Sequence, residues 1–274
     1  MRAAVRAARR LDDAFRSTRD RRVTSRLVRD PDAPAVVLSP HFDDAVINCW
    51  SVLTGAADVR VVNIFAGAPP RGSTTLWDRI CGASDSSAHM QARVGEDLEA
   101  LGRAGRTAIN LPFLDSQYKR RRPSLARLDA ALAEALPAAA ALYAPAGLGF
   151  EPHPDHVLVR RLAVAASRKG VSVHLYADVP YAVSFGWPDW VTGATSEGRL
   201  DVDAFWQRLE RDVQSIHSLR GAEVVRLGPE TAERKLEAMR AYRTQFAALD
   251  GGSVGLLRNP LIHGFEVFWE VAPS

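Results

Sequence analysis

Two short stretches of this chain bring histidine and aspartate together at a spacing that suits metal-assisted catalysis. The first is Pro40-His41-Phe42-Asp43-Asp44 and the second is His153-Pro154-Asp155-His156. Imidazole nitrogens and carboxylate oxygens are the ligands that zinc takes in catalytic sites. Together the stretches hold enough ligands for one catalytic metal, with a carboxylate and an imidazole left for proton transfer. This inventory is typical of a metal-assisted hydrolase.

Each stretch alone also has an ordinary structural explanation. Asp43 or Asp44 stands where a helix begins, and Asp155 stands just before a helix opening at His156, so each carboxylate suits a helix N-cap. Capping does not explain two adjacent carboxylates preceded by a histidine. Where the two preceding strands lie close together, two histidines and one aspartate converge on a metal that keeps open positions for water and substrate. Zinc is the expected ion, and ferrous iron accepts the same ligands.

The elements that must position these stretches follow an alternating pattern. Apolar runs typical of buried strands occupy residues 35–39, 59–65, 107–111, 141–144 and 171–176. Helical patterns separate them at 45–53, 90–101, 125–136 and 157–167. This alternation predicts an α/β fold with a mostly parallel sheet and helices on both faces. Two further helices, at 204–219 and 229–248, and a strand at 264–271 complete the predicted chain.

Composition and charge narrow the class of protein. The 274 residues are 47% hydrophobic and 24% charged, and the net charge of +3 is too small to indicate a nucleic-acid partner. Two cysteines without a Cys-x-x-Cys pair make a thiolate metal site unexpected. Neither a secretory signal nor an apolar run long enough to span a membrane is found, so we expect a cytoplasmic protein. Residues 1–33 are predicted to form an Arg-rich helical extension, and residues 34–274 a single catalytic domain.

Two long loops are expected to shape the substrate pocket. Residues 67–88 are rich in Gly, Pro, Ser and Thr, and residues 179–196 contain Tyr181, Phe185, Trp187 and Trp190. Both begin where predicted strands end, and ligands of open α/β sheets bind beyond the carboxyl ends of the strands. The aromatic loop either forms the wall of a sugar-binding pocket or packs onto the body of the protein.

The two His/Asp stretches resemble those of the PIG-L/LmbE-like family of zinc-dependent N-deacetylases. That family carries a His-Pro-Asp-Asp stretch after its first strand and a His-Pro-Asp-His stretch later. Three other segments, 93–97, 111–115 and 235–245, are similar to the family's Arg-x-x-Glu helix, its Leu-x-x-x-Asp segment and a late Lys…Ala…Tyr…Gln helix. The resemblance covers roughly residues 34 to 270.

The resemblance implies a fold, a reaction and a role for each matching residue. The implied fold is a Rossmann-like α/β sandwich. The implied reaction is removal of an N-acetyl group from a GlcNAc-type sugar or a glycosylated secondary metabolite, which gives a free amine and acetate. By position, the zinc ligands are His41, Asp44 and His156; Asp43 is the general base; His153, held by Asp155, acts on the intermediate and the leaving amine; and Arg93, Asp115 and Glu151 meet the substrate.

The chain departs from the family pattern at two places, and other functions stay open. Phe42 replaces the usual proline, and Asn48-Cys49-Trp50 stands where members often have small residues and glycines. One alternative is an amidase acting on another acyl group or on a thiol-conjugate amide. A second is a non-catalytic carbohydrate-binding protein, although all the ligand and base positions carry competent residues. A nucleotide-dependent oxidoreductase is disfavoured because no Gly-x-Gly-x-x-Gly follows the first strand.

Overall fold

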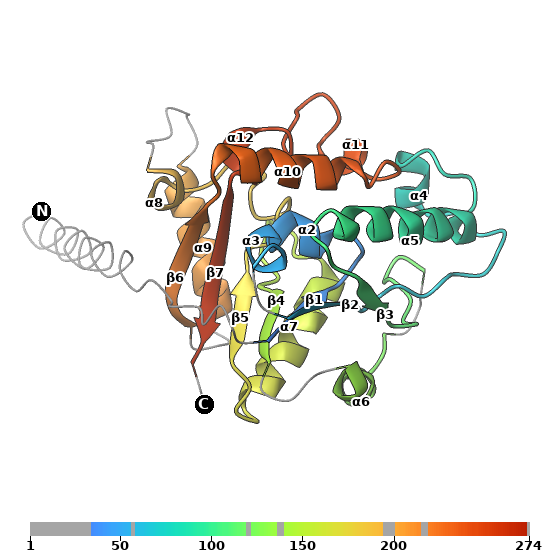
Figure 1. Cartoon of the computed structure of the whole chain (residues 1–274), viewed down its shortest axis with the longest axis horizontal. Helices are drawn as coiled ribbons and strands as arrows, with labels where there is room; N and C mark the ends of the chain where they lie inside the picture. The colour runs from blue at the N-terminus through green and yellow to red at the C-terminus, as the bar shows by residue number, and fades with distance from the viewer. Residues whose placement is uncertain are drawn as a thin grey trace, which may run out of the picture.

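A mixed seven-stranded sheet forms the centre of the computed structural model, which describes residues 34–55, 58–118, 122–135, 140–193, 201–214 and 219–272 (Figure 1). The strand order is β3-β2-β1-β4-β5-β7-β6. The first five strands in that order run parallel, and β7 is antiparallel to both β5 and β6. The strands are β1 (Ala35–Ser39), β2 (Val59–Asn63), β3 (Ala108–Asn110), β4 (Ala141–Pro145), β5 (Val173–Tyr176), β6 (Leu219–Arg226) and β7 (Phe265–Val271).

The middle of the sheet is buried on both faces. Every residue of β1 is buried, because its alternating side chains meet helices on each side. Val37 of β1 lies opposite Val61 of β2 on one side and Tyr143 of β4 on the other. The predicted α/β fold with a mostly parallel sheet and helices on both faces is therefore confirmed.

The helices form one layer on each face of the sheet. The upper layer in Figure 1 contains α2 (Asp44–Asn48), α3 (Trp50–Leu53), α5 (Ser86–Gly102) and α10 (Pro229–Arg240), and the lower layer contains α6 (Leu125–Ala135) and α7 (Pro154–Ser167). The remaining helices are α4 (Leu76–Ile80), α8 (Asp189–Thr192), α9 (Val202–Gln214), α11 (Phe246–Leu249) and α12 (Pro260–His263). No helix in the described part of the chain is long and apolar enough to cross a membrane.

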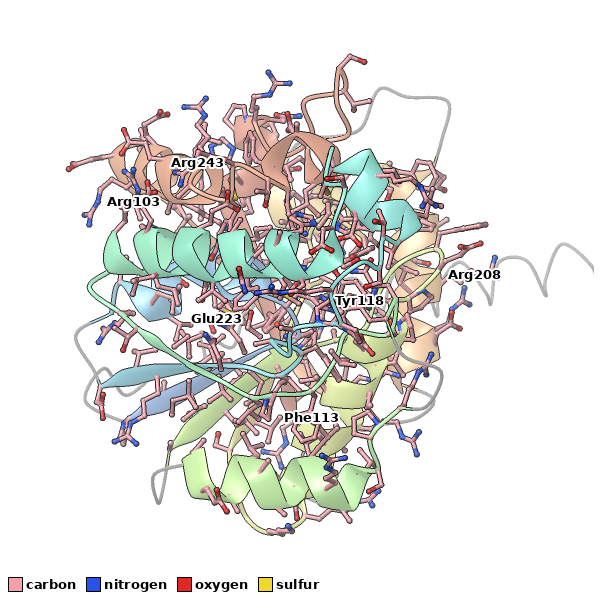
Figure 2. The ribbon with its side chains drawn as sticks, turned by 90° about the vertical axis from the view of Figure 1, so that its right-hand side faces the viewer. Arg103, Phe113, Tyr118, Arg208, Glu223 and Arg243 are labelled. Atoms are coloured by element: carbon pink, nitrogen blue, oxygen red, sulfur yellow. The ribbon has the colours of Figure 1, made fainter. Side chains whose placement is uncertain are left out.

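Carboxylates on α5 hold the segment that follows α10. Glu96 accepts hydrogen bonds from Thr244 N at 3.0 Å and Thr244 Oγ1 at 2.8 Å. Glu99 lies 2.6 Å from an Arg243 guanidinium nitrogen and 3.2 Å from one of Arg103, and both arginines lie on the outer side of these helices (Figure 2). These contacts fix the short connection between α10 and α11, which reaches over the ends of the strands.

Several predicted boundaries were wrong. The helix predicted over 45–53 is two helices, broken at Cys49, and the helix predicted over 229–248 ends at Arg240 before α11 begins. The helix predicted over 204–219 ends at Gln214 in the described residues, and Leu219 begins β6. β6 was not predicted because its sequence, LRGAEVVR, mixes charges with Gly221 at a bulge, as a half-exposed edge strand tolerates. The extension predicted over residues 1–33 lies outside the described residues.

The strand order creates a crevice at the ends of β1 and β4. From β1 the chain continues outward to β2 and β3, then returns to place β4 on the other side of β1. Such a reversal of strand order leaves a gap between the connections at the carboxyl ends of the two central strands, where ligands bind in open α/β sheets. Both His/Asp stretches leave the sheet at this point.

Candidate active site

The loop after β1 is shaped by its own short polar side chains. The Ser39 hydroxyl donates to the carbonyl of His41 and accepts from the backbone N–H of Ala45 at 3.0 Å. The Asp44 carboxylate accepts from the backbone N–H of His41 at 2.8 Å. These bonds fold the loop into a tight turn that places the side chains of His41 and Asp44 side by side.

Phe42 makes this turn rigid without the proline that the family usually has. Its carbonyl accepts a hydrogen bond from the Tyr242 hydroxyl at 2.8 Å, and that hydroxyl also donates to Asp97 at 2.8 Å. The buried Phe42 ring lies 5.4 Å below the Arg93 guanidinium, a cation–π contact. The departure at position 42 therefore stiffens the turn from outside and positions Arg93.

The second His/Asp stretch begins α7. His153 is the N-cap residue and its Nδ1 accepts from the backbone N–H of Asp155 at 3.3 Å, while Pro154 takes the first helical position. Asp155 thus lies in the first turn of α7, so the prediction that it caps a helix opening at His156 was wrong. Its carboxylate accepts from the backbone N–H of Ser116 at 2.7 Å. This arrangement turns His153 toward the crevice and His156 toward the loop after β1.

Three donor atoms from the two stretches form a nearly equilateral triangle. His156 Nε2 lies 3.3 Å from His41 Nδ1 and 3.4 Å from Asp44 Oδ2, and the latter two atoms are 3.4 Å apart. Ligands at about 2.0–2.1 Å from a tetrahedral zinc ion stand roughly 3.3–3.4 Å from one another. The triangle fits a facial metal site made from the three residues that the resemblance implied.

Two other groupings of possible metal ligands exist in the same place. Donor atoms of His41, His153 and His156 lie within 4.8 Å of one another, and so do those of His41, Asp115, His153 and Asp155. Neither grouping contains all three atoms of the triangle, whose separations of 3.3–3.4 Å match those expected around a tetrahedral zinc ion. The triangle is therefore the candidate metal site.

Each histidine of the triangle has a carboxylate at its other ring nitrogen. His156 Nδ1 lies 2.9 Å from Asp178 Oδ1, and Asp178 is fully buried. His41 Nε2 lies 3.6 Å from Asp115 and 3.5 Å from Asp155. Carboxylates in this position fix the tautomer and the orientation of metal-binding histidines. Asp178 was not predicted, because it follows β5 and no local motif marks it.

The same carboxylates dominate the electrostatics of the site. Burial lowers the pKa of His41, but Asp115, Asp155 and Asp44 outweigh it and raise the pKa to about 9. Burial raises the pKa of Asp44, but His156 and His41 outweigh it and hold the pKa well below its usual range. The pKa of Asp43 is raised by burial and by the neighbouring Asp44. The crevice is therefore lined by several buried carboxyl groups, and their negative charge suits the binding of a cation.

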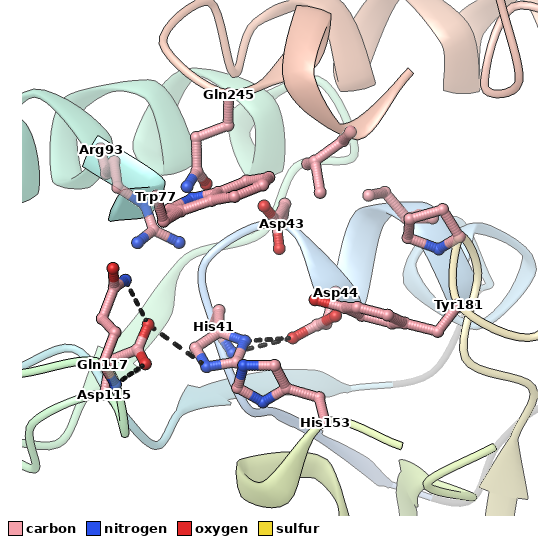
Figure 3. Close-up of a pocket in the computed structure, with 13 residues that line it drawn as sticks. His41, Asp43, Asp44, Trp77, Arg93, Asp115, Gln117, His153, Tyr181 and Gln245 are labelled. Carbon is pink, nitrogen blue, oxygen red and sulfur yellow. Dashed lines mark hydrogen bonds and ion pairs between the residues drawn. The ribbon is translucent and has the colours of Figure 1, made fainter. Parts of the chain in front are cut away.

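A pocket of about 260 Å³ opens above the triangle. Asp43 and His153 stand on its floor beside His41 and Asp44 (Figure 3). Asp43 is the N-cap residue of α2, yet its carboxylate makes no capping hydrogen bond. The capping explanation therefore does not account for Asp43, whose carboxylate faces the pocket.

The roof of the pocket comes from more distant segments. Trp77 of α4, Arg93 of α5, Gln117 and Gln245 surround the upper part of the cavity (Figure 3). Arg93 and Gln245 are buried, and neither Arg93 Nε nor Gln245 Oε1 has a hydrogen-bond partner among the described residues. Gln117 donates to Asp115 through its side chain at 2.9 Å. The roof therefore offers polar groups for a ligand to satisfy.

A buried aspartate anchors the helix that carries Trp77. Asp78 accepts hydrogen bonds from Ser86 Oγ at 2.5 Å and from Tyr118 Oη at 3.1 Å, and it lies 2.8 Å from His89 Nδ1. Thr75 caps the same helix in a reciprocal capping box with Asp78. These bonds place the loop over 67–88 against the site, as the sequence indicated in general terms.

The structure gathers most of the predicted site residues in one place. His41, Asp43, Asp44, Arg93, Asp115 and His153 line the pocket, and Asp155 and His156 lie buried directly behind them. Glu151 is exposed and does not line the pocket. Sequence reasoning gave no individual site role to Trp77, Gln117, Pro180 and Gln245, although it expected the loops that carry Trp77, Pro180 and Tyr181 to shape the pocket.

The aromatic loop after β5 divides between the two roles expected for it. Tyr181 lines the pocket, with its ring 5.3 Å from that of His156. Trp187 is buried, stacks on Trp206 and donates to the carbonyl of Ile262, so it packs onto the body of the protein. Among the described residues of this loop, Pro180 and Tyr181 at its beginning line the pocket.

Comparison with known proteins gives the same picture. Residues 36–167 match the family model PIG-L, described as GlcNAc-PI de-N-acetylase. A triple mutant of a deacetylase from the teicoplanin biosynthetic pathway is 26% identical, with 88% of this chain and 98% of that chain covered and a TM-score of 0.66. A deacetylase–teicoplanin complex from that pathway is 24% identical, with 88% and 99% covered and a TM-score of 0.63.

A more distant likeness concerns the fold alone. The N,N'-diacetylchitobiose deacetylase from Pyrococcus horikoshii, complexed with its inhibitor, is 17% identical, with 90% of this chain and 87% of that chain covered and a TM-score of 0.53. A search of the curated proteins gave no match. The match of residues 36–167 to the family model and the likeness of the fold to deacetylases of known structure support the PIG-L/LmbE-like deacetylase family for this chain.

Proposed function

We propose that this protein is a metal-dependent hydrolase that removes the N-acetyl group from an amino sugar, either a GlcNAc-type sugar or the sugar of a glycosylated secondary metabolite. The observation that carries the proposal is the donor triangle of His41, Asp44 and His156, with Asp43 and His153 beside it on the pocket floor. A ligand site, a spare carboxylate and a spare imidazole are the groups that amide hydrolysis requires.

The donor set favours zinc, and ferrous iron is the alternative. Two imidazole nitrogens and one carboxylate oxygen would hold either ion and leave positions open. When bound there, such an ion would acidify water and polarise the substrate carbonyl. The other histidine nitrogens already have carboxylate neighbours, so each ring is oriented for a ligand at the triangle.

Asp43 is placed to act as the general base. Its carboxylate faces the pocket, is buried, and is not used to cap α2. It follows His41 by two positions and precedes Asp44, so it reaches the same small space as the triangle. From this position it takes the proton of the attacking water while the water oxygen forms the new bond to the amide carbon.

His153 is placed to act on the leaving nitrogen. Its Nδ1 accepts from the backbone N–H of Asp155, so the proton of the neutral ring is on Nε2. Burial and the neighbouring rings of His41 and His156 lower the pKa of His153 to about 3, so the ring stays neutral and keeps this proton. The Nε2–H donates a hydrogen bond to the leaving nitrogen, and the proton that Asp43 took from water passes to that nitrogen as the carbon–nitrogen bond breaks, which releases the free amine and acetate.

Pocket size and lining indicate how the substrate is held. A cavity of about 260 Å³ is at the small end for ligand sites and suits the acetamido group with the sugar ring that carries it. Arg93 presents a buried guanidinium, and Asp115 presents a carboxylate, so both suit sugar hydroxyls. The remainder of a larger glycoside must stay outside the pocket.

A mass-spectrometric screen tests the proposal. The metal-loaded protein is incubated with N-acetylated monosaccharides, chitobiose-type sugars and N-acylated glycosides, and products lacking the acyl unit are sought. The Asp43→Asn variant serves as the matched control, because it should retain the metal but lose at least about 10²-fold in rate. Product from an N-acetylated sugar would support the proposal. Product only from a substrate with another acyl group, or from a thiol conjugate, would show an amidase with a different substrate. Binding of a sugar without any product would indicate a carbohydrate-binding protein.

A further inference from the structure

The indole of Trp77 lies in the roof of the pocket, and no proposed step of the reaction uses it. Figure 3 shows the ring lying across the cavity, seen nearly edge-on, with His41 and Asp44 below it on the floor. One face of the ring is therefore turned toward the floor. The side chain is only half-buried, so part of its apolar surface remains for a ligand to cover.

We propose that Trp77 is a platform for the sugar ring of the substrate, with one face of a pyranose packed against the indole while its acetamido group reaches the donor triangle. This inference deepens the proposed function and rests on it. A pyranose directs C–H groups above and below its ring and its equatorial hydroxyls outward. The C–H face is apolar, and the indole face carries the negative side of the ring's quadrupole, so the two attract each other through dispersion and electrostatics.

The orientation of α4, the helix that carries Trp77, is unusual for a helix at the surface. Such helices normally turn their apolar residues inward. In α4, Asp78 is fully buried, whereas Leu76 and Ile80 are 67% and 58% exposed. Burial of apolar surface therefore does not determine how this helix is turned. Departures from an ordinary folding rule are expected at functional sites, and this departure directs Trp77 into the pocket.

Hydrogen bonds to Asp78 determine the orientation of α4 instead. Asp78 Oδ2 accepts from the backbone N–H of Thr75 at 2.9 Å and lies 2.7 Å from Thr75 Oγ1, at the start of the helix. The same carboxylate accepts from the hydroxyls of Ser86 and Tyr118, which belong to α5 and to the loop after β3. Because Asp78 directly follows Trp77, these contacts fix the neighbouring indole. We assign Asp78 as a positioning residue for Trp77.

A chain of polar contacts ties the roof to the floor of the pocket. Thr75 Oγ1 lies 2.5 Å from Gln117 Oε1, and Gln117 Nε2 donates to Asp115 Oδ2 at 2.9 Å. The same Asp115 oxygen lies 3.6 Å from His41 Nε2, beside the donor triangle. These contacts set the height of the Trp77 ring above the triangle. The space for a sugar ring is therefore formed before the ligand binds, which lowers the cost of binding.

Calorimetry with a ligand that is bound but not turned over tests the platform. The metal-loaded Asp43→Asn protein, with and without a further substitution, is titrated with the methyl glycoside of N-acetylglucosamine. Adding Trp77→Ala should weaken binding about 10–30-fold, whereas Trp77→Phe keeps an aromatic face and should stay within about threefold. Adding Leu76→Ala changes the exposed neighbour on the same helix and should leave the affinity within about twofold. Equal affinity after Trp77→Ala, or no binding to the Asp43→Asn protein, would overturn the proposal.

Acetate serves as the probe without a sugar ring. It is small enough to bind at the donor triangle without touching the roof, so the Trp77→Ala variant should bind acetate within about twofold of the protein that retains Trp77. An equal loss of affinity for acetate and for the glycoside would overturn the proposal, because it would show that the substitution damages the pocket as a whole. The urea-unfolding midpoints of all variants accompany the titrations.

Steady-state kinetics keeps this test separate from the test of the proposed function. When the protein releases acetate from the glycoside, Trp77→Ala should raise KM about 10–30-fold with kcat within about threefold, because stacking holds the ring equally in the ground state and the transition state. A loss in kcat with unchanged KM would overturn the platform. A wild type that releases no acetate, while Trp77→Ala still weakens glycoside binding, would refute the deacetylase function but not the platform.

A double-mutant cycle tests the role of Asp78. Asp78→Asn should weaken glycoside binding in the Asp43→Asn protein and should cause no further loss when Trp77→Ala is also present, because Asp78 acts through the indole. The affinity for acetate should not change. Losses that multiply would show that Asp78 supports the fold and does not position Trp77.

Discussion

His156 is held at both ring nitrogens, with Asp178 at Nδ1 and the other two ligand atoms of the triangle near Nε2. The contact with Asp178 therefore fixes the ring so that its other nitrogen faces the triangle. The two histidines come from loops 115 residues apart in sequence, and only the pairing of β1 with β4 brings them together.

The first prediction concerns metal content. Purified wild-type protein should hold about one divalent ion per chain, and His156→Ala should lose it, since two donors remain of three. His174→Phe, which keeps the stacking on Tyr143 away from the pocket, should retain the wild-type content. Elemental analysis after dialysis measures this, and equal content in all three proteins would remove the proposed metal site.

The second prediction concerns the carboxylate behind His156. Asp178→Asn keeps the shape but not the charge, so the affinity for zinc should fall by about 10–100-fold. A competing chelator of known affinity measures the change. Asp129→Asn, which alters an exposed carboxylate paired with Lys169, should bind zinc as wild type does. An Asp178→Asn affinity within twofold of this control would show that the ring of His156 is oriented by packing alone.

At the level of residues, the sequence predicted the site residues that lie close together along the chain and missed several that come from distant segments. His41, Asp43, Asp44 and the 153–156 stretch were predicted because each set lies within five residues. Asp178 and Trp77 belong to the same site, but they reach it through the ends of β5 and of the loop after β2. Glu151 lies two positions before His153, yet the turn into α7 leaves it exposed.

At the level of elements, a buried ion pair ties α10 to the sheet and to α3. Lys235 Nζ lies 2.9 Å from Glu266 Oε1, and both side chains are buried. Glu266 also accepts from the backbone N–H groups of Trp50 at 2.7 Å and Ser51 at 3.0 Å, which begin α3. One carboxylate thus holds three elements beneath the active-site layer.

The third prediction follows from this pair. Lys235→Met should lower the free energy of unfolding by about 3–5 kcal/mol, because it leaves the Glu266 charge buried without a cation. Arg240→Met on the same helix removes an exposed partner of Glu233 and should cost less than about 1 kcal/mol. Urea unfolding measures both. Equal losses in the two variants would mean that Glu266 is neutralised by other means.

Helix and strand types were predicted better than their ends. The bounds of β1 and β4 were predicted to within one residue from their apolar runs. A strand that is buried on both faces has no polar positions to interrupt such a run. The break at Cys49 was not predicted because no Gly or Pro stands there. The helix that follows begins where Glu266, far along the chain, accepts a hydrogen bond from the backbone N–H of Trp50. β6 was missed because pairing with β7, and not local pattern, makes it a strand.

At the level of the whole molecule, stability is linked to pH through a buried carboxyl group that lies outside the donor triangle. Burial raises the pKa of Asp97 to about 7, against hydrogen bonds from Tyr242 and Asn63 that lower it. Asp43 nearby also raises this pKa, and Arg93 lowers it. The folded protein therefore holds this proton up to about neutral pH, whereas the unfolded chain releases it near pH 3.9.

The fourth prediction is the resulting pH dependence. Asp97 binds more protons in the folded state between about pH 4 and 7, so its contribution to stability is largest below pH 4 and falls as pH rises to 7. The Asp97→Asn variant has no titrating group at this position and therefore lacks this contribution to stability. The unfolding free energy of the variant minus that of wild type should rise by up to about 4 kcal/mol from pH 4 to pH 8. Urea unfolding at each pH measures the difference. A difference that does not change with pH would mean that Asp97 has an ordinary pKa in the folded protein.

The position of β7 governs how the sheet is completed. β7 follows β6 along the chain, yet it lies between β5 and β6. In the described sheet β6 pairs with β7 alone, so it has no place there until β7 is present. On the ribosome, the parallel half of the sheet emerges first, and β5 keeps an unpaired edge that other nascent chains can join. Arrival of β7 closes that edge and brings β6 with it in one step.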